Sequence, residues 1–270
     1  MEIANRGCSA VSARQFTVRR RRGGALVLLG PERVYKVALN PQQMRQIRDE
    51  VAGNRAAQGD AFWRGAILPA RPVPLGLVSP RAVALAPADP VIARYLAAGL
   101  RRVERKPVRP ADQLVQRHLF ETLMSQRGAD QQRGRILHYL SDFRIPESSA
   151  HGDLNAHNFL VWNGRVVVID WGLYRPVSSF IFDAAHHYII HEAMRARLSW
   201  IDVVFDSMPR ASAIQALARR FDLTVRQLIV AYVMNRADTE GEQFRRLNGA
   251  LPARFRSKYE RVYARIDQWL

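Results

Sequence analysis

The chain has 270 residues, 48% of them hydrophobic, which is enough for one large folded domain or two small ones and argues against disorder. Its single cysteine, Cys8, excludes a disulfide framework or a cysteine metal cluster within the chain and is typical of a reducing compartment. The formal net charge of +17 favours anionic partners and disfavours cations, although a genome's coding bias can also produce a surplus of arginine.

The N-terminal residues lack the apolar core of a signal peptide, and no apolar stretch reaches the roughly 20 residues that a membrane-spanning helix needs. We therefore expect a cytoplasmic protein. Nucleic acid is not an expected partner, because the charge alone is weak support for one. Peripheral contact with an anionic membrane surface is compatible with it.

The first part of the chain is typical of strands. Short apolar or alternating runs separated by glycine-containing turns predict strands at residues 15–20, 25–29 and 34–39. Asn40 and Pro41 then have the residue types of a helix N-cap and first turn, and Met44, Ile47 and Val51 recur at helical spacing. Two more strands are predicted around residues 72–78 and 82–86, followed by a linker at residues 86–90.

Helical patterns dominate the rest of the chain. They predict helices at residues 91–103, 111–125 and 130–143 and from about residue 176 to the end. A polar loop at residues 148–172 contains a predicted strand pair at 159–162 and 166–169, joined by the hairpin turn Asn163-Gly164. The pattern predicts an α+β fold, with a sheet-and-helix lobe at residues 1–88 and a mostly helical lobe at 89–270.

The most informative segment is HGDLNAHN at residues 151–158, followed after the hairpin by IDWG at 169–172. Mg²⁺ prefers a few carboxylate or amide oxygens from protein, and the strand pair would bring Asn158 and Asp170 to the same end of the hairpin. Asp153, five residues before Asn158, could accept the proton of a substrate hydroxyl. This combination is suited to phosphoryl transfer, which depends on positioning and charge balance.

These residues resemble the H-x-D-x-x-x-x-N and D-x-G motifs of the protein-kinase-like superfamily. The glycine after His151 and the tryptophan at 171 are most similar to the aminoglycoside and choline phosphotransferase branch, and DLNAHN is also similar to kinases of the lipopolysaccharide sugar Kdo. The resemblance implies a bilobal kinase-like fold with ATP and Mg²⁺. It also implies that Asp153, Asn158 and Asp170 are catalytic, with Asn158 and Asp170 as the metal ligands.

The resemblance implies further nucleotide-binding residues. Lys36, one of only three lysines, lies in the third predicted strand and would hold the α- and β-phosphates, with Glu50 as its partner. An exposed strand lysine and an ordinary solvated acid are the alternatives. Gly23 and Gly24 could cover the phosphates, but they lack the G-x-G-x-x-G spacing and a plain hairpin turn explains them as well.

Several polar residues have two interpretations. Asp183 either braces the catalytic loop, as an aspartate does in related small-molecule kinases, or caps a helix. For His151 we expect packing and hydrogen bonding within the loop, and for His157 an ordinary loop position. A zinc site is not expected at the remaining three histidines, because no carboxylate pattern completes one: His186, His187 and His191.

The expected activity is transfer of the γ-phosphate of ATP to a hydroxyl of a small molecule or glycan. Charge argues against a polycationic acceptor, and a lipopolysaccharide-core sugar at the inner face of the membrane is one candidate. A protein Ser/Thr kinase is an alternative, but Asn155 stands where such kinases carry a lysine, and no A-P-E segment follows Asp170. A second alternative is a binding module that has the kinase fold but no catalytic activity.

Overall fold

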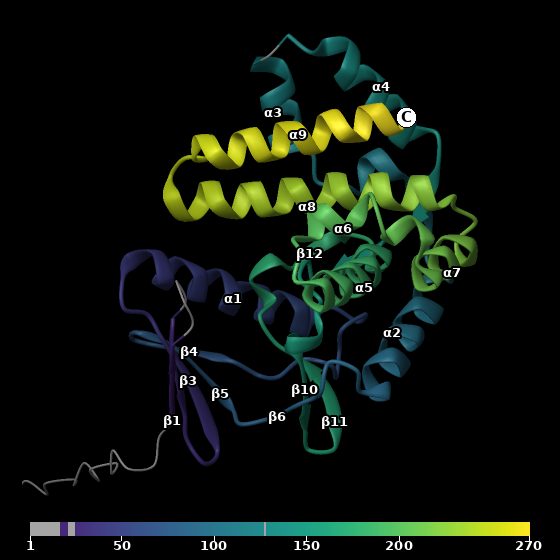
Figure 1. Cartoon of the computed structure of the whole chain (residues 1–270). Coiled ribbons are helices and arrows are strands. Elements are labelled where there is room, and N and C mark those ends of the chain that lie inside the picture. Colours follow the sequence, from purple (N-terminus) through teal and green to yellow (C-terminus); the bar gives the residue numbers. More distant parts are fainter. Residues whose placement is uncertain (1–16, 21–24, 127) are drawn as a thin grey trace, which may run out of the picture.

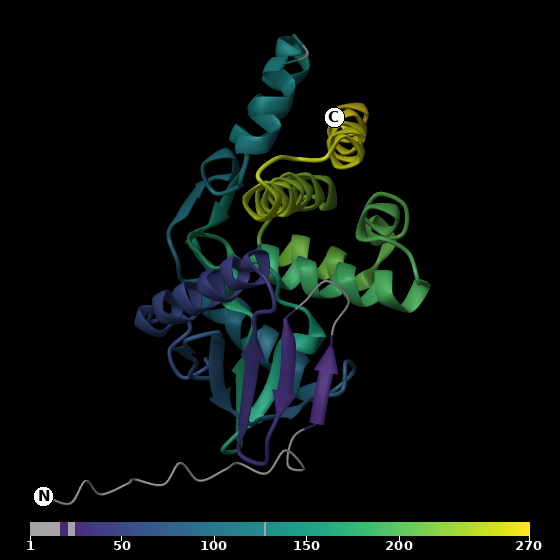
Figure 2. The same ribbon diagram turned by 90° about the vertical axis from the view of Figure 1, so that its left-hand side faces the viewer.

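The computed structural model describes residues 17–20, 25–126 and 128–270. A twisted antiparallel sheet lies at one end of the molecule and a group of helices at the other, with helix α1 (Pro41–Gly59) between them (Figures 1 and 2). The sheet has the order β1-β2-β3-β5-β4, with these strands: β1 (Thr17–Arg20), β2 (Leu26–Leu29), β3 (Arg33–Val37), β4 (Arg71–Val73) and β5 (Gly76–Pro80). The three predicted strands at the start of the chain are confirmed, except that residues 15 and 16 of the first lie outside the described residues.

The later strand predictions need two corrections. The strand expected at residues 72–78 is the hairpin of β4 and β5, because the chain turns at Pro74 and Leu75. A Cβ at Gly76 would collide with the Lys36 carbonyl, so glycine allows β5 to approach β3 closely here. The strand expected at 82–86 is only β6 (Val83–Ala84), and it pairs with β10 (Phe159–Trp162) instead of extending the sheet.

Helix α1 begins as the sequence predicts. The Asn40 side chain accepts a hydrogen bond from the Gln43 amide at 2.9 Å, and Pro41 occupies the first turn. The predicted apolar stripe is only partly right, since Ile47 is buried but Met44 and Val51 are half-buried. Two polar side chains share the buried face of the helix with the apolar ones: Gln43 and Asn54.

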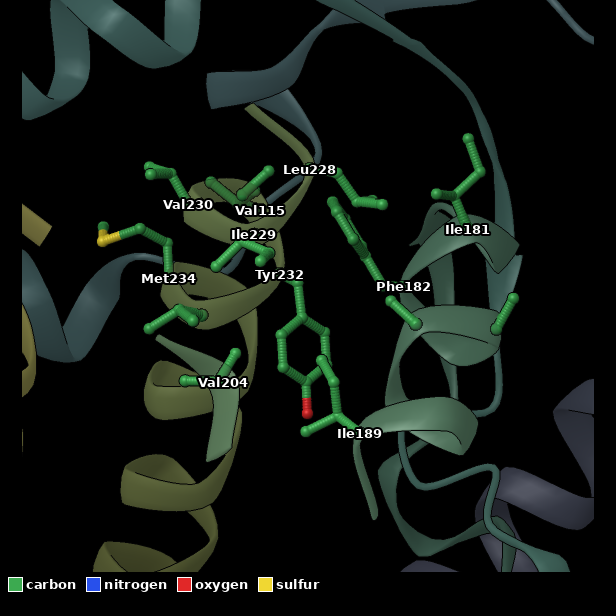
Figure 3. Close-up of a cluster of buried hydrophobic side chains, with 14 of the residues drawn as sticks. Val115, Ile181, Phe182, Ile189, Val204, Leu228, Ile229, Val230, Tyr232 and Met234 are labelled. Atoms are coloured by element: carbon green, nitrogen blue, oxygen red, sulfur yellow. The ribbon is translucent and has the colours of Figure 1, made fainter. Parts of the chain in front are cut away.

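Eight α-helices follow in the described part of the chain: α2 (Pro90–Val103), α3 (His118–Gln126), α4 (Asp130–Ser141), α5 (Phe180–Ala196), α6 (Trp200–Val204), α7 (Ser212–Arg220), α8 (Val225–Asn248) and α9 (Ala253–Trp269). Four short strands connect them: β7 (Val108–Pro110), β8 (Arg144–Pro146), β9 (Ser148–Ala150) and β12 (Arg175–Ser178). Apolar side chains of α5 and α8 form much of the core, as Figure 3 shows around Tyr232, Phe182 and Ile189.

The helix predicted at residues 111–125 is broken. A short 3₁₀ turn, Ala111–Gln113, comes first and α3 begins only at His118. Two side chains of α8 take the backbone donors that a continuous helix would use. Asn235 accepts from the Gln116 amide at 3.0 Å, and Asp238 accepts from the Phe120 amide at 3.1 Å. Among the described helices, none has the length and apolar character needed to cross a membrane.

Candidate active site

The hairpin that carries the motif forms as predicted. Strand β10 pairs antiparallel with β11 (Arg165–Val168), and Asn163 and Gly164 both have positive φ, 49° and 72°, as a type I′ turn requires. At the open end, the Ile169 amide donates to the Asn158 carbonyl at 3.1 Å. Asn158 and Asp170 therefore lie at the same end of the ribbon. Asp170 itself has a left-handed backbone (φ 65°), which is unusual for a residue other than glycine and is common at functional sites.

Lys36, Glu50 and Asp170 form one charged cluster, which we call the lysine centre. The Lys36 Nζ donates to both Glu50 oxygens, at 2.8 and 2.9 Å, and it also contacts Asp170 Oδ1. Burial acts to lower the pKa of Lys36, but the charges of Glu50 and Asp170 outweigh it and raise that pKa. Burial raises the pKa of Glu50, against the opposing charge of Lys36. The predicted pairing of strand lysine and helix glutamate is thus present.

The close approach of α1 to the segment after β11 sets this geometry. A Cβ at Gly53 would collide with the Trp171 carbonyl, so only glycine allows the helix backbone to lie this near. One helical turn earlier, Glu50 points to Lys36, whereas Asp49 reaches Arg246 of α8 at 3.5 Å. Of the two neighbouring acids, Glu50 is the partner, as its helix position predicted.

Asp183 holds the backbone at the start of the motif loop at residues 151–158. Its two carboxylate oxygens accept from the His151 amide at 2.6 Å and from the Gly152 amide at 2.9 Å. Burial raises the pKa of Asp183 to about 7, and these two backbone donors oppose that rise. Ser179, not Asp183, caps helix α5. The structure therefore favours the brace over the cap.

His151 is fully buried and packs edge-on against Trp171, with ring centroids 4.6 Å apart. Its Nδ1 accepts from the Asp153 amide at 3.2 Å, so the proton is on Nε2, which donates to the Ile169 carbonyl at 2.8 Å. Burial lowers its pKa, which keeps the ring neutral. The expected packing role is confirmed. His157 is exposed and borders the cavity described below.

Asp153 belongs to a second cluster that the sequence did not predict, which we call the arginine centre: Arg236, Asp153 and Glu240. The Arg236 guanidinium lies 3.2 Å from Asp153 Oδ1 and 3.4 Å from Glu240 Oε1. His186 donates to the same Asp153 oxygen at 3.1 Å. Burial acts to raise the pKa of Asp153, but the His186 hydrogen bond and the Arg236 charge hold it well below its ordinary value.

Asn158 lies beside Asp153 but is not among the residues that line the cavity described below. Its side chain is buried, and its amide nitrogen donates to the Asp153 carbonyl at 2.8 Å, so the amide oxygen is the end that could reach a metal. In the described segments, no group of three or more His, Cys, Asp and Glu side chains is placed to hold a metal, either at this site or elsewhere. An amide oxygen and the Asp170 carboxylate fit Mg²⁺, which takes few protein ligands.

Both centres open onto one cavity of about 950 Å³ between the sheet, α1 and the hairpin. One part of its lining is apolar, from Val27, Val34, Leu77, Leu85, Leu160 and Ile169. The other part contains the charged residues Lys36, Glu50, Asp153, Asp170 and Arg236. The first part suits a flat, apolar ring and the second suits phosphate groups and a polar acceptor. Gly23 and Gly24, predicted to cover the phosphates, lie outside the described residues.

No family model and no curated protein matches the sequence. The fold, however, is similar to that of solved phosphotransferases. Aminoglycoside phosphotransferase APH(4)-Ia, a thermostable mutant with ADP and hygromycin B, has a TM-score of 0.55 at 13% identity, over 94% of this chain and 93% of its own. Macrolide 2'-phosphotransferase MphH from Brachybacterium faecium has 0.53 at 17% identity, over 91% of each chain.

A choline/ethanolamine kinase family protein from Mesorhizobium loti has a TM-score of 0.50 at 14% identity, over 94% of this chain and 87% of its own. The chain therefore has the bilobal α+β fold of the protein-kinase-like phosphotransferases, as its motif predicted. At these identities the similarity concerns the fold, and the chemistry has to be argued from the site.

Proposed function

We propose that the protein is an ATP- and Mg²⁺-dependent phosphotransferase that moves the γ-phosphate to a hydroxyl of a small molecule or glycan. The observation that carries this proposal is the convergence of Lys36, Asp153 and Asp170 on one cavity, although they are far apart in sequence. A cation for phosphate, a carboxylate for metal and a second carboxylate for a hydroxyl are the groups that this reaction needs.

Each group has a role that its surroundings support. Lys36, oriented by Glu50, would bind the α- and β-phosphates, and the apolar part of the cavity would take the base. Asn158 and Asp170 would hold magnesium, which supplies positive charge to the phosphate oxygens when bound. Asp153 would accept a hydrogen bond from the acceptor hydroxyl and align its oxygen with the γ-phosphate.

The acceptor that we propose is not a polycation. Three acids line the cavity in the described part of the chain: Glu50, Asp153 and Asp170. Each of them contacts Lys36 or Arg236, so a cationic acceptor would have to displace a resident cation. A sugar hydroxyl, in particular one of the lipopolysaccharide core, is the acceptor we would test first. The charge of +17 would then favour work at the inner face of an anionic membrane.

The test is a transfer assay with purified protein, Mg-ATP and a panel of acceptors: Kdo-lipid A, neutral sugars, aminoglycosides and a generic protein substrate. Mass spectrometry detects the added phosphate. We expect transfer to a glycan. In Asp153→Asn, the transfer rate should fall about 10²–10⁴-fold, which is the usual effect of removing a proton-accepting group. ATP affinity, measured by calorimetry, should be kept in that variant.

Three results would each refute part of the proposal. Phosphorylation of the protein substrate alone would identify a protein kinase. If ATP and Mg²⁺ neither bind nor stabilise the protein, the fold serves as a binding module without catalysis. Unchanged turnover in Asp153→Asn would show that Asp153 does not act on the acceptor.

A further inference from the structure

The carboxylate of Asp153 is held by two donors from two different helices. Nε2 of His186, on α5, lies 3.1 Å from Oδ1, and Nη1 of Arg236, on α8, lies 3.2 Å from the same oxygen. The donor side chains are 3% and 11% exposed, whereas Asp153 is 33% exposed. The other oxygen, Oδ2, has the loop residue Asn155 at 3.3 Å. One oxygen is thus fixed from the interior, and the exposed part of the side chain borders the cavity.

His186 is itself fixed in one orientation and one tautomer. Its Nδ1 lies 2.9 Å from the Tyr232 hydroxyl, so the ring bridges Tyr232 and Asp153. Burial, together with the charge of Arg236, lowers the pKa of His186, and burial raises that of Tyr232. A neutral imidazole carries a single N–H, and the carboxylate can only accept. Nε2 therefore carries the proton toward Asp153, and Nδ1 accepts from the tyrosine.

Arg236 is anchored on three sides. Its guanidinium donates to the Gly152 carbonyl at 3.0 Å in addition to contacting Asp153 and Glu240. Glu240 in turn accepts from Trp200 at 3.1 Å and from Tyr259 at 3.3 Å. The rigid planar fork of arginine makes such a multiple contact directional. Helices α6, α8 and α9 therefore determine where the guanidinium meets the catalytic loop.

We propose that His186 and Arg236 are positioning residues for phosphoryl transfer: together they fix Oδ1 of Asp153 and so present Oδ2 to the acceptor hydroxyl. This inference rests on the function proposed above. Without the two donors, the carboxylate could rotate about its side-chain bonds, and the acceptor oxygen would lose its alignment with the phosphate. Misplacement of a reacting group by about 1 Å can cost roughly 10²-fold in rate.

Two substitutions of His186 separate positioning from support of the fold. In His186→Gln, the amide nitrogen can occupy the place of Nε2 and donate to Asp153, but the contact with Tyr232 is lost. In His186→Asn, the shorter amide can reach Tyr232 but not Asp153. We expect His186→Gln to keep most of kcat and His186→Asn to lose roughly 10- to 100-fold. KM for ATP should be the same in both, because neither change touches the lysine centre.

His187→Gln is the matched control. His187 is the next residue of the same helix and is also buried, but its ring faces Phe159 at 6.0 Å and not Asp153. This variant should destabilise the protein, because it removes the packing of a buried histidine, but it should leave kcat and KM close to the wild-type values. If the two His186 variants lose kcat equally, or in proportion to their loss of thermal stability, His186 only supports the fold and the inference is wrong.

A measurement on the unmodified protein does not depend on turnover. In nitrogen-15 spectra, the His186 ring should be the neutral tautomer protonated at Nε2, and Asp153→Asn should change its shifts more than those of His187. A ring protonated at Nδ1 would overturn the inference. Wild-type protein that transfers no phosphate to any acceptor but shows the expected tautomer would count against the proposed function and leave the geometry of His186 confirmed.

Discussion

The lysine centre and the arginine centre have the same charge pattern, but their residues come from different kinds of positions in the fold. Each is one cation shared by two carboxylates, and each includes one acid of the kinase-like motif, Asp170 or Asp153. The lysine centre, however, joins a strand, a helix and the hairpin end, all from distant parts of the chain. In the arginine centre, cation and one acid are four residues apart on α8.

This difference in construction would distinguish the two ends of the proposed reaction. The geometry of the lysine centre exists only while α1 and the sheet keep their position on the hairpin. Under the proposed function, nucleotide binding would therefore depend on that arrangement. The arginine centre lies within the helical lobe, on a framework that α6, α8 and α9 hold together. We infer that the acceptor end is pre-built and that the nucleotide end is the adjustable one.

The largest expected effect follows from removing the two cations with the same substitution. Arg236→Met would leave Asp153 and Glu240 without their shared cation and would also remove the hydrogen bond to the Gly152 carbonyl, and breaking such a largely buried pair costs about 3 kcal/mol. Lys36→Met should cost less, about 1.5 kcal/mol, because the Lys36 side chain is 21% exposed against 11% for Arg236, so that water can replace more of the lost interaction.

Urea unfolding of both variants measures these losses, provided that the slopes with denaturant remain equal. Lys36→Met should additionally abolish most ATP binding, whereas Arg236→Met should affect ATP binding little if it remains folded. A larger loss of stability in Lys36→Met would contradict the comparison, since it would make the lysine centre the more rigid of the two.

Low pH should have a smaller effect, and it should act on the buried histidines around the arginine centre. His151, His186 and His187 are buried in the helical lobe with lowered pKa values, that of His187 to about 4, and burial is the main cause for each. A buried histidine with a lowered pKa binds its proton more weakly in the folded state. The stability it contributes is therefore fully present above about pH 6.5 and is lost as the pH falls toward the folded pKa.

Asp183 and Glu50 act in the opposite direction, because a carboxyl group with a raised pKa gains stability as the pH falls. The informative quantity is therefore the difference between variants: between about pH 7 and pH 4.5, we expect thermal unfolding of His187→Gln to lose less stability than that of the wild type. The same pH dependence in both proteins would show that the His187 ring is protonated in the folded state without cost.

The two centres also differ in how far the sequence predicts them. Lys36 stands out as one of three lysines, and Glu50 and Asp170 follow from helix position and a local motif. Arg236 is one of 38 arginines (41 basic residues less three lysines), and its contact with Asp153 depends on how α8 packs against the motif loop at residues 151–158. No local pattern contains that information. For the other contacts of this loop, the sequence offered one indication: Asp183 and His186 are three residues apart and so share one helix face, from which both can reach residues 151–153.

The fold shows the same limit. Strands β1 to β3, the cap of α1 and the hairpin turn at Asn163 were predictable because their causes are local. The pairing of β6 with β10 and the late start of α3 were not, since both depend on partners far along the chain. Tertiary contacts override local preference where the segment is short and its backbone donors find outside acceptors.

The smallest effect on stability is expected at the contact between α1, which carries Glu50, and α8, which carries Arg236. Arg246 reaches Asp49 at 3.5 Å, and Arg45 donates to the Leu247 carbonyl at 3.1 Å. The ion pair is 38–40% exposed on both sides, so Arg246→Ala should lower the free energy of unfolding by less than about 1 kcal/mol.

Its effect on ATP should nevertheless be measurable, because α1 carries Glu50 and α8 carries Arg236. If the junction helps to hold α1, a loss of about 0.5 kcal/mol would weaken ATP binding roughly twofold, since 1.4 kcal/mol corresponds to tenfold. Arg195→Ala removes a comparable exposed pair, with Glu192 on α5, and should leave ATP binding unchanged. Equal ATP affinity in the two variants would mean that the contact of Gly53 with Trp171 alone positions the helix, and that α8 does not connect the acceptor end to the nucleotide end.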